Sequence, residues 1–144
     1  MRIAGVLTAS FANGEGVRYV IFTQGCFHGC PECHNPETHS LHGGYHISVE
    51  ELAEDIKNRK HLDGITLSGG EPFLQQEECL RLINLLHGMN VWIYTGYEYE
   101  DIEDEPLAKK ADAIVCGPYI KELRCEGKHY GSSNQRIVRR NKDE

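Results

Sequence analysis

The sequence predicts an α/β fold, an open partial (βα) barrel built from a single domain over residues 1–144. Short runs of β-branched and aromatic residues alternate with amphipathic helical segments, which is typical of a parallel sheet with right-handed crossovers. About four such units fit in the chain, whereas a closed eight-stranded barrel needs roughly 200 residues or more. We therefore expect an open barrel whose strand ends converge on one rim.

Local patterns predict each element in order. Residues 2–9 and 17–24 are strand-like, with turn-forming residues between them. Ser48 and Glu51 form a capping box before apolar residues at helical spacing, so a helix is expected from Val49. The later strands are expected at residues 65–67, 91–94, 113–116 and 135–138, and the later helices at residues 74–87 and 107–111. Residues 36–47 and 121–131 have loop composition.

Composition and charge narrow the function classes. The net charge of −7 argues against a nucleic-acid polymer or an anionic membrane as the main partner. We find no signal peptide or membrane-length apolar run, so a cytoplasmic protein is expected. Six acids fall within residues 98–105 and the stretch 136–142 is basic; either is solvated surface or part of a polarised face for a protein partner.

Residues 25–36 hold three of the six cysteines, Cys26, Cys30 and Cys33, in the spacing C-x3-C-x2-C. Glycines and prolines exclude a continuous helix or central strand here, and the loop follows directly on a predicted strand. A 4Fe–4S cluster is usually held by four cysteines, so three thiolates would leave one iron open to a substrate or cofactor.

Spacing alone leaves zinc as an alternative, because His28 or His34 could complete a Cys3His set. A disulfide framework is disfavoured in a reducing compartment. Cys79 and Cys116 are expected to be buried thiols. Cys125 lies in a polar loop, where an incidental thiol is favoured over a remote fourth ligand.

A second motif, Gly69-Gly70-Glu71-Pro72, follows the strand at residues 65–67. Its glycines would let a ligand approach the backbone, and Glu71 could pair with an ammonium group. Residues 95–97 follow the next strand and should reach the same rim.

The pairing of C-x3-C-x2-C with a strand-end GGEP resembles the radical S-adenosylmethionine enzymes. More narrowly, the chain resembles the activating proteins of anaerobic (class III) ribonucleoside-triphosphate reductases. The matching stretches are residues 14–26, 30–39, 67–72, 92–97, 116–123 and 131–137. The last of these, GSSNQRI, separates this family from longer relatives.

The resemblance implies a 4Fe–4S cluster held by Cys26, Cys30 and Cys33, with S-adenosylmethionine chelating the fourth iron through its amino and carboxylate groups. It implies that Glu71 and the nearby backbone receive the amino group. The implied cofactor-binding residues are Glu32, Cys33, His34, Gly69, Gly70, Glu71 and Thr95. The position before the third cysteine is often aromatic in the superfamily but is Glu32 here, so a main-chain contact is expected there.

The resemblance also implies the chemistry. One electron from the reduced cluster would cleave the C5′–S bond, and the resulting radical would take hydrogen from a glycine of the large reductase subunit. A flavodoxin-type protein would supply the electron, and no catalytic residue beyond the cluster and cofactor is needed. Six histidines are expected at the surface: His39, His42, His46, His61, His87 and His129.

Three other functions remain open: an activase of another glycyl-radical enzyme such as pyruvate formate-lyase, a 7-carboxy-7-deazaguanine synthase-like enzyme, and a non-catalytic zinc-binding module. The short chain and GSSNQRI disfavour the first, and the second would need a different C-terminal half. The sequence leaves open which glycine is the target, the oligomeric state, and the roles of residues 98–105 and 131–137.

Overall fold

The structure is a computed structural model, and it describes residues 1–25, 44–118, 120–123, 132 and 134–140. The predicted cluster loop lies outside these residues, as do His39, His42, Cys125 and His129.

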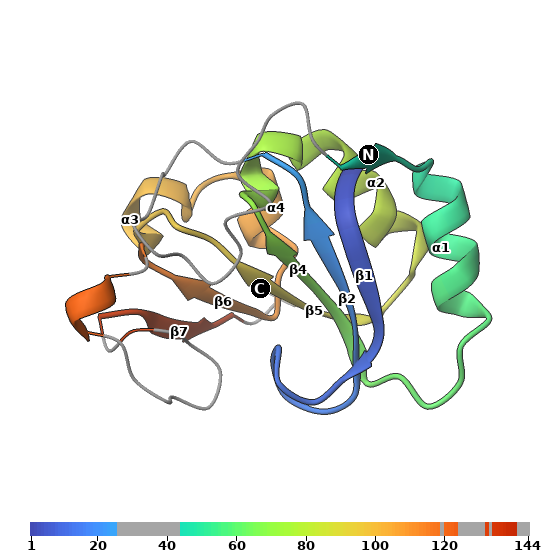
Figure 1. Cartoon of the computed structure of the whole chain (residues 1–144), viewed down its shortest axis with the longest axis horizontal. Helices are drawn as coiled ribbons and strands as arrows, with labels where there is room; N and C mark the ends of the chain where they lie inside the picture. The colour runs from blue at the N-terminus through green and yellow to red at the C-terminus, as the bar shows by residue number, and fades with distance from the viewer. Residues whose placement is uncertain (26–43, 119, 124–131, 133, 141–144) are drawn as a thin grey trace.

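Within the described residues the chain forms one open sheet in the order β3-β1-β2-β4-β5-β6-β7 (Figure 1). The strands are β1 (Arg2–Ser10), β2 (Arg18–Thr23), β3 (Tyr45–His46), β4 (Gly64–Gly69), β5 (Asn90–Tyr94), β6 (Ala113–Cys116) and β7 (Arg136–Arg139). The four central neighbours, β2, β4, β5 and β6, run parallel, which confirms an open α/β sheet with a parallel core.

The two flanks of the sheet, outside these parallel units, are antiparallel. Strands β1, β3 and β7 pair antiparallel with their neighbours. The connection of residues 11–17 between β1 and β2 is too short for a crossover, so the chain must reverse there. Strand β3 lies within the stretch predicted as a loop.

The described helices are α1 (Val49–Lys57), α2 (Gln76–Leu85), α3 (Tyr99–Ile102) and α4 (Pro106–Lys109), with short 3₁₀ turns η2 (Pro72–Gln75) and η3 (Lys121–Leu123). The predicted capping is confirmed, since the Ser48 side chain accepts a hydrogen bond from the Glu51 N–H at 3.0 Å. Helix α2 starts later than expected because Pro72 opens a 3₁₀ turn first. None of the helices described is long and apolar enough to cross a membrane.

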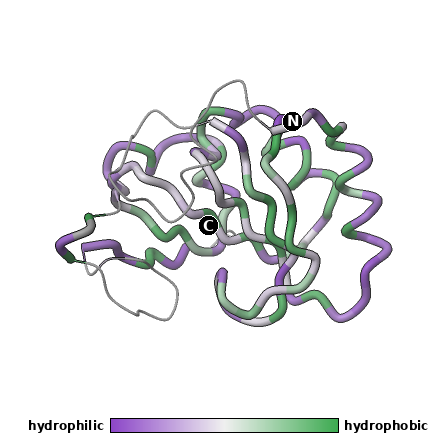
Figure 2. The backbone as a smooth tube through the Cα atoms, in the orientation of Figure 1, coloured by the Kyte–Doolittle hydropathy of each residue, from purple (hydrophilic) through white to green (hydrophobic). Residues whose placement is uncertain are grey.

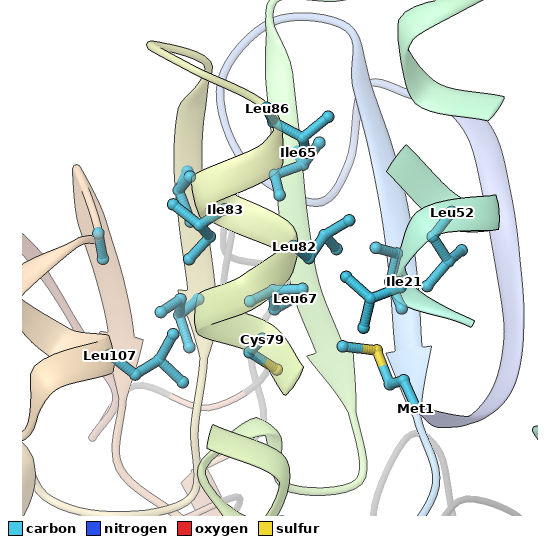
Figure 3. Close-up of a cluster of buried hydrophobic side chains, with 14 of the residues drawn as sticks. Met1, Ile21, Leu52, Ile65, Leu67, Cys79, Leu82, Ile83, Leu86 and Leu107 are labelled. Atoms are coloured by element: carbon cyan, nitrogen blue, oxygen red, sulfur yellow. The ribbon is translucent and has the colours of Figure 1, made fainter. Parts of the chain in front are cut away.

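The main core lies between the sheet and the helices. Figure 3 shows Ile21, Ile65 and Leu67 of the strands facing Leu52 of α1 and Leu82 of α2. The hydropathy colouring in Figure 2 follows this pattern, with apolar strands and helices that are hydrophilic where they face solvent. The helices α1 and α2 therefore cover this face of the sheet.

The opposite face, called here the inner face, carries a smaller cluster of Trp92, Ala113 and Val115, with Tyr94 and Ile137 packed against it. At the amino ends of the parallel strands, residues 11–17 fold over this face. The Asn13 carbonyl accepts the Thr66 hydroxyl at 2.6 Å, and Glu15 forms a bidentate ion pair with Arg139 at 2.6 and 3.0 Å.

The acidic and basic stretches noted in the sequence meet each other. Arg136 pairs with Glu100 at 2.8 Å, and Arg140 donates to the Tyr99 hydroxyl and the Glu103 carbonyl. The Arg136–Glu100 pair is exposed, so it contributes little to stability. Whether a partner contacts residues 98–105 stays a prediction.

Candidate functional site

The loops after β2 and β4 are joined at the carboxyl ends of the strands. The Gly70 N–H donates to the Thr23 carbonyl at 2.8 Å, and the Glu71 N–H donates to the Gly25 carbonyl at 2.8 Å. Cys26 is the next residue after Gly25 in the sequence. The chain therefore enters the predicted cluster loop directly beside the GGEP motif.

Glu71 ties the loop after β4 to the loop after β5. It is 1% exposed. Its carboxylate accepts the Thr95 hydroxyl at 2.7 and 2.9 Å, the Gly96 N–H at 2.9 Å and the Phe73 N–H at 3.2 Å. A buried carboxylate needs such donors, and charge-assisted bonds of this kind are the stronger ones. The two loops consequently form one rigid unit.

The hydrogen bonding continues to the next strand. The Gly117 N–H, after β6, donates to the Tyr97 carbonyl at 2.8 Å. The loops after β2, β4, β5 and β6 thus form a continuous rim, as the sequence predicted for the first three.

Gly69 is required by strand packing. It adopts φ +88°, and a Cβ there would lie 2.5 Å from the Thr23 nitrogen. A side chain would thus strain the backbone and collide with β2. Gly69 and Gly70 are both partly exposed, so their main chain is open to a ligand.

The structure brings together four of the predicted cofactor-binding residues, Gly69, Gly70, Glu71 and Thr95. The Thr95 hydroxyl is bound to Glu71 and also accepts the Tyr97 N–H at 3.2 Å. Cofactor contacts by these residues stay predictions. The sequence did not predict the role of the Phe73 and Gly96 N–H groups. Every residue except proline has a backbone N–H, so residue type does not show which of them bind a side chain.

The predicted ligands Cys26, Cys30 and Cys33, and the predicted contacts Glu32 and His34, lie outside the described residues. In the described part of the chain, no three His, Cys, Asp or Glu side chains form a metal site. Cys79 and Cys116 are buried, as predicted, and burial raises the pKa of both thiols. They therefore stay protonated and are poor metal ligands. His46, His61 and His87 are exposed, as expected.

In its described part, the motif at residues 131–137 anchors the loop after β6. Asn134 Nδ2 donates to the Pro118 carbonyl at 2.9 Å, and Gln135 Nε2 donates to the Gly117 carbonyl at 3.0 Å. The Ser132 hydroxyl accepts the Ile120 N–H at 3.3 Å. These three side chains, called here the β6–β7 clamp, fix the loop after β6 at the rim.

Comparison with known proteins agrees with this geometry. A family described as a 4Fe-4S single cluster domain matches residues 12–138. The anaerobic ribonucleoside-triphosphate reductase-activating protein of Enterobacteria phage T4 is 34% identical, covering 92% of this chain and 90% of that protein. The protein of the same name from Vibrio cholerae is 32% identical, covering 88% and 90%. The pyruvate formate-lyase-activating enzyme of Clostridium pasteurianum is 34% identical, covering 79% of this chain but 50% of that enzyme.

Proposed function

Because this chain belongs to the family of anaerobic ribonucleoside-triphosphate reductase-activating proteins, we propose that it generates a glycyl radical on an anaerobic ribonucleoside-triphosphate reductase. It does so with a 4Fe–4S cluster and S-adenosylmethionine. The observation that carries the proposal is the bond from Glu71 N–H to Gly25 O, which puts the start of the C-x3-C-x2-C loop against the GGEP motif.

The residues present fit this pair of cofactors. Cys26, Cys30 and Cys33 hold the cluster, and their number leaves one iron free for the cofactor's amino and carboxylate groups. When bound, the two cofactors together supply the one-electron reduction that enables hydrogen removal from carbon. The protein's own task is to orient them and keep water out.

Glu71 acts by holding the loops of the rim together. Since its carboxylate is bound to Thr95, Gly96 and Phe73, it holds the partly exposed backbone of Gly69 and Gly70 in place. We propose that this backbone and Glu71 receive the amino group, and that the main chain of Glu32, Cys33 and His34 lies along the adenosine. A flavodoxin-type protein in the cytoplasm supplies the electron.

Chain coverage favours the reductase over pyruvate formate-lyase as the protein substrate. The match to the reductase-activating proteins spans about nine tenths of both chains. The match to the pyruvate formate-lyase-activating enzyme spans half of that enzyme.

The test is an anaerobic co-incubation of the reconstituted protein with the full-length reductase, S-adenosylmethionine and dithionite. We expect a glycyl-radical doublet in the EPR spectrum. The protein alone should show a broad iron–sulfur absorbance and a reduced-cluster EPR signal that changes when S-adenosylmethionine is added. A colourless, EPR-silent protein with one zinc per chain would mean a zinc-binding module instead.

Ligand variants test the cluster assignment. Cys26→Ala, Cys30→Ala and Cys33→Ala should each abolish cleavage of S-adenosylmethionine, because each leaves an iron without its thiolate. Cys79→Ala is the control and should retain cleavage, since Cys79 lies in the core with its thiol 3.7 Å from the Pro72 carbonyl. Full cleavage by any of the first three variants would contradict the assignment.

A further inference from the structure

The Gln75 side chain joins two separate main-chain segments to the turn that follows the GGEP motif. Gln75 is the last residue of η2, which begins at Pro72 of that motif. Its Oε1 accepts the Arg2 N–H at 2.8 Å, and its Nε2 donates to the Arg2 carbonyl at 2.7 Å and to the Gln24 carbonyl at 3.2 Å. The amide therefore uses its acceptor and its donors on the backbone of β1 and of the residue after β2.

These bonds lie where the chain enters and leaves the predicted cluster loop. Gln24 is two positions before Cys26, and its N–H also donates to the Arg2 carbonyl at 3.1 Å. Gly44 is the first residue that the structure describes after the loop. A Cβ on Gly44 would lie 2.3 Å from the Ile3 carbonyl oxygen and 3.0 Å from the Gln24 Cβ, and β3, which follows, pairs with Arg2 and Ile3. The start of β1 thus holds the chain on both sides of the loop.

We propose that Gln75 is a positioning residue for the cluster, because it fixes the base of the cysteine loop to the turn after the GGEP motif. This inference rests on the proposed function. Fixing the ends of a loop in advance reduces the entropy that is lost when the loop closes around a ligand. Loss of the Gln75 bonds should therefore weaken the hold on the cluster while all three thiolates remain.

The neighbouring link between the two loops does not depend on residue type. The bond from the Glu71 N–H to the Gly25 carbonyl joins main chain to main chain, so any residue except proline at position 71 could form it. The Gln75 bonds need a side chain with both a donor and an acceptor at that length. Substitution at Gln75 consequently separates this contact from the rest of the rim.

The test compares Gln75→Met with the matched variant Gln76→Met. Methionine keeps the length of the side chain and removes its hydrogen bonds. Gln76 is half-buried like Gln75, and its Oε1 also accepts a backbone N–H, that of Leu107, at 2.9 Å. That bond joins α2 to α4, away from the cluster loop. Both variants should lower the urea midpoint of the metal-free protein to a similar extent, so a difference in the cluster reports on position and not on stability.

The decisive measurement is the rate at which the reconstituted cluster loses iron to a chelator under anaerobic conditions. Gln75→Met should release iron about 3- to 10-fold faster than the wild-type protein, and Gln76→Met at the wild-type rate. Gln75→Glu keeps an acceptor for the Arg2 N–H but cannot donate to the Gln24 carbonyl, so it should release iron as fast as Gln75→Met. The reduced-cluster EPR signal with S-adenosylmethionine should change in the two Gln75 variants and not in Gln76→Met. Equal iron release by Gln75→Met and Gln76→Met, or an unchanged EPR signal, would overturn the inference.

Failure of the proposed function gives a different result. If the wild-type protein assembles the cluster but forms no glycyl-radical doublet on the reductase, the proposed function fails and the iron-release rates still decide the role of Gln75. If the doublet forms and the two methionine variants release iron equally, the Gln75 inference alone fails. A wild-type protein that binds zinc in place of the cluster would overturn both.

Discussion

At the scale of the residue, Glu71 should stabilise the fold as well as the site. Replacing it with Gln puts an amide NH₂ against an N–H donor, either Phe73 or Gly96, and leaves a donor unsatisfied. Glu71→Gln should lower the free energy of unfolding by about 1–3 kcal/mol and weaken S-adenosylmethionine binding. Urea unfolding and equilibrium dialysis under anaerobic conditions measure the two effects. Thr95→Ser keeps the hydroxyl that donates to Glu71 and is the control. An equal loss of stability and of S-adenosylmethionine binding in that variant would show that side-chain packing, and not the Glu71 carboxylate, causes the effect.

The sequence predicted Glu71 as a site residue but not how it is held. Its partners Thr95 and Gly96 follow a different strand, so their proximity depends on the register of β4 with β5. Likewise Gly69 signalled an open backbone, whereas its neighbour Thr23 could be identified only once β2 and β4 were paired.

At the scale of the element, the sequence predicted those helices and strands whose determining residues lie close together in the chain. Helix α1 has its cap and its apolar spacing within ten residues. Strand β3 was missed because two residues carry no periodicity, and it exists through pairing with Arg2 and Ile3. Helix α3 was missed because it has only four residues, two of them acidic; Ile102 anchors it in the core.

The β6–β7 clamp gives a prediction at this scale. Asn134→Ala removes the bond to the Pro118 carbonyl and should free the loop after β6. We expect faster amide exchange at residues 117–123 and a stability loss of only about 0.5–1.5 kcal/mol. Hydrogen-exchange mass spectrometry measures the first effect. Arg136→Ala, which breaks an exposed pair with Glu100, is the control and should leave exchange there unchanged; loss of global stability with unaltered local exchange would argue against a clamp.

At the scale of the whole molecule, the parallel core follows from the alternation of strands and helices, but the contact of residues 11–17 with the inner face does not. Residues 11–17 reach β7 through the pair of Glu15 with Arg139, 124 positions apart. Turn composition alone cannot show such a contact. Residues 11–17 thus lie over the inner face at the amino ends of the parallel strands, and the rim lies at their carboxyl ends.

Arg18 should be essential to the packing at the amino ends of the parallel strands. Its guanidinium is buried and donates to the Thr66 hydroxyl at 2.8 Å, and to the carbonyls of Glu15 at 2.8 Å and Ile65 at 2.7 Å. Burial lowers the pKa of Arg18 to about 10, so it remains a cation at neutral pH.

Arg18→Ala would leave these acceptors without their donor and should cost about 2–5 kcal/mol of stability in urea unfolding. Because the change lies at the end of the strands opposite the rim, S-adenosylmethionine cleavage per folded molecule should stay near the wild-type rate. Arg59→Ala, which loses an exposed pair with Asp55, should cost no more than about 0.5 kcal/mol. Lost cleavage with stability retained would show that a change at the amino ends of the strands affects the rim.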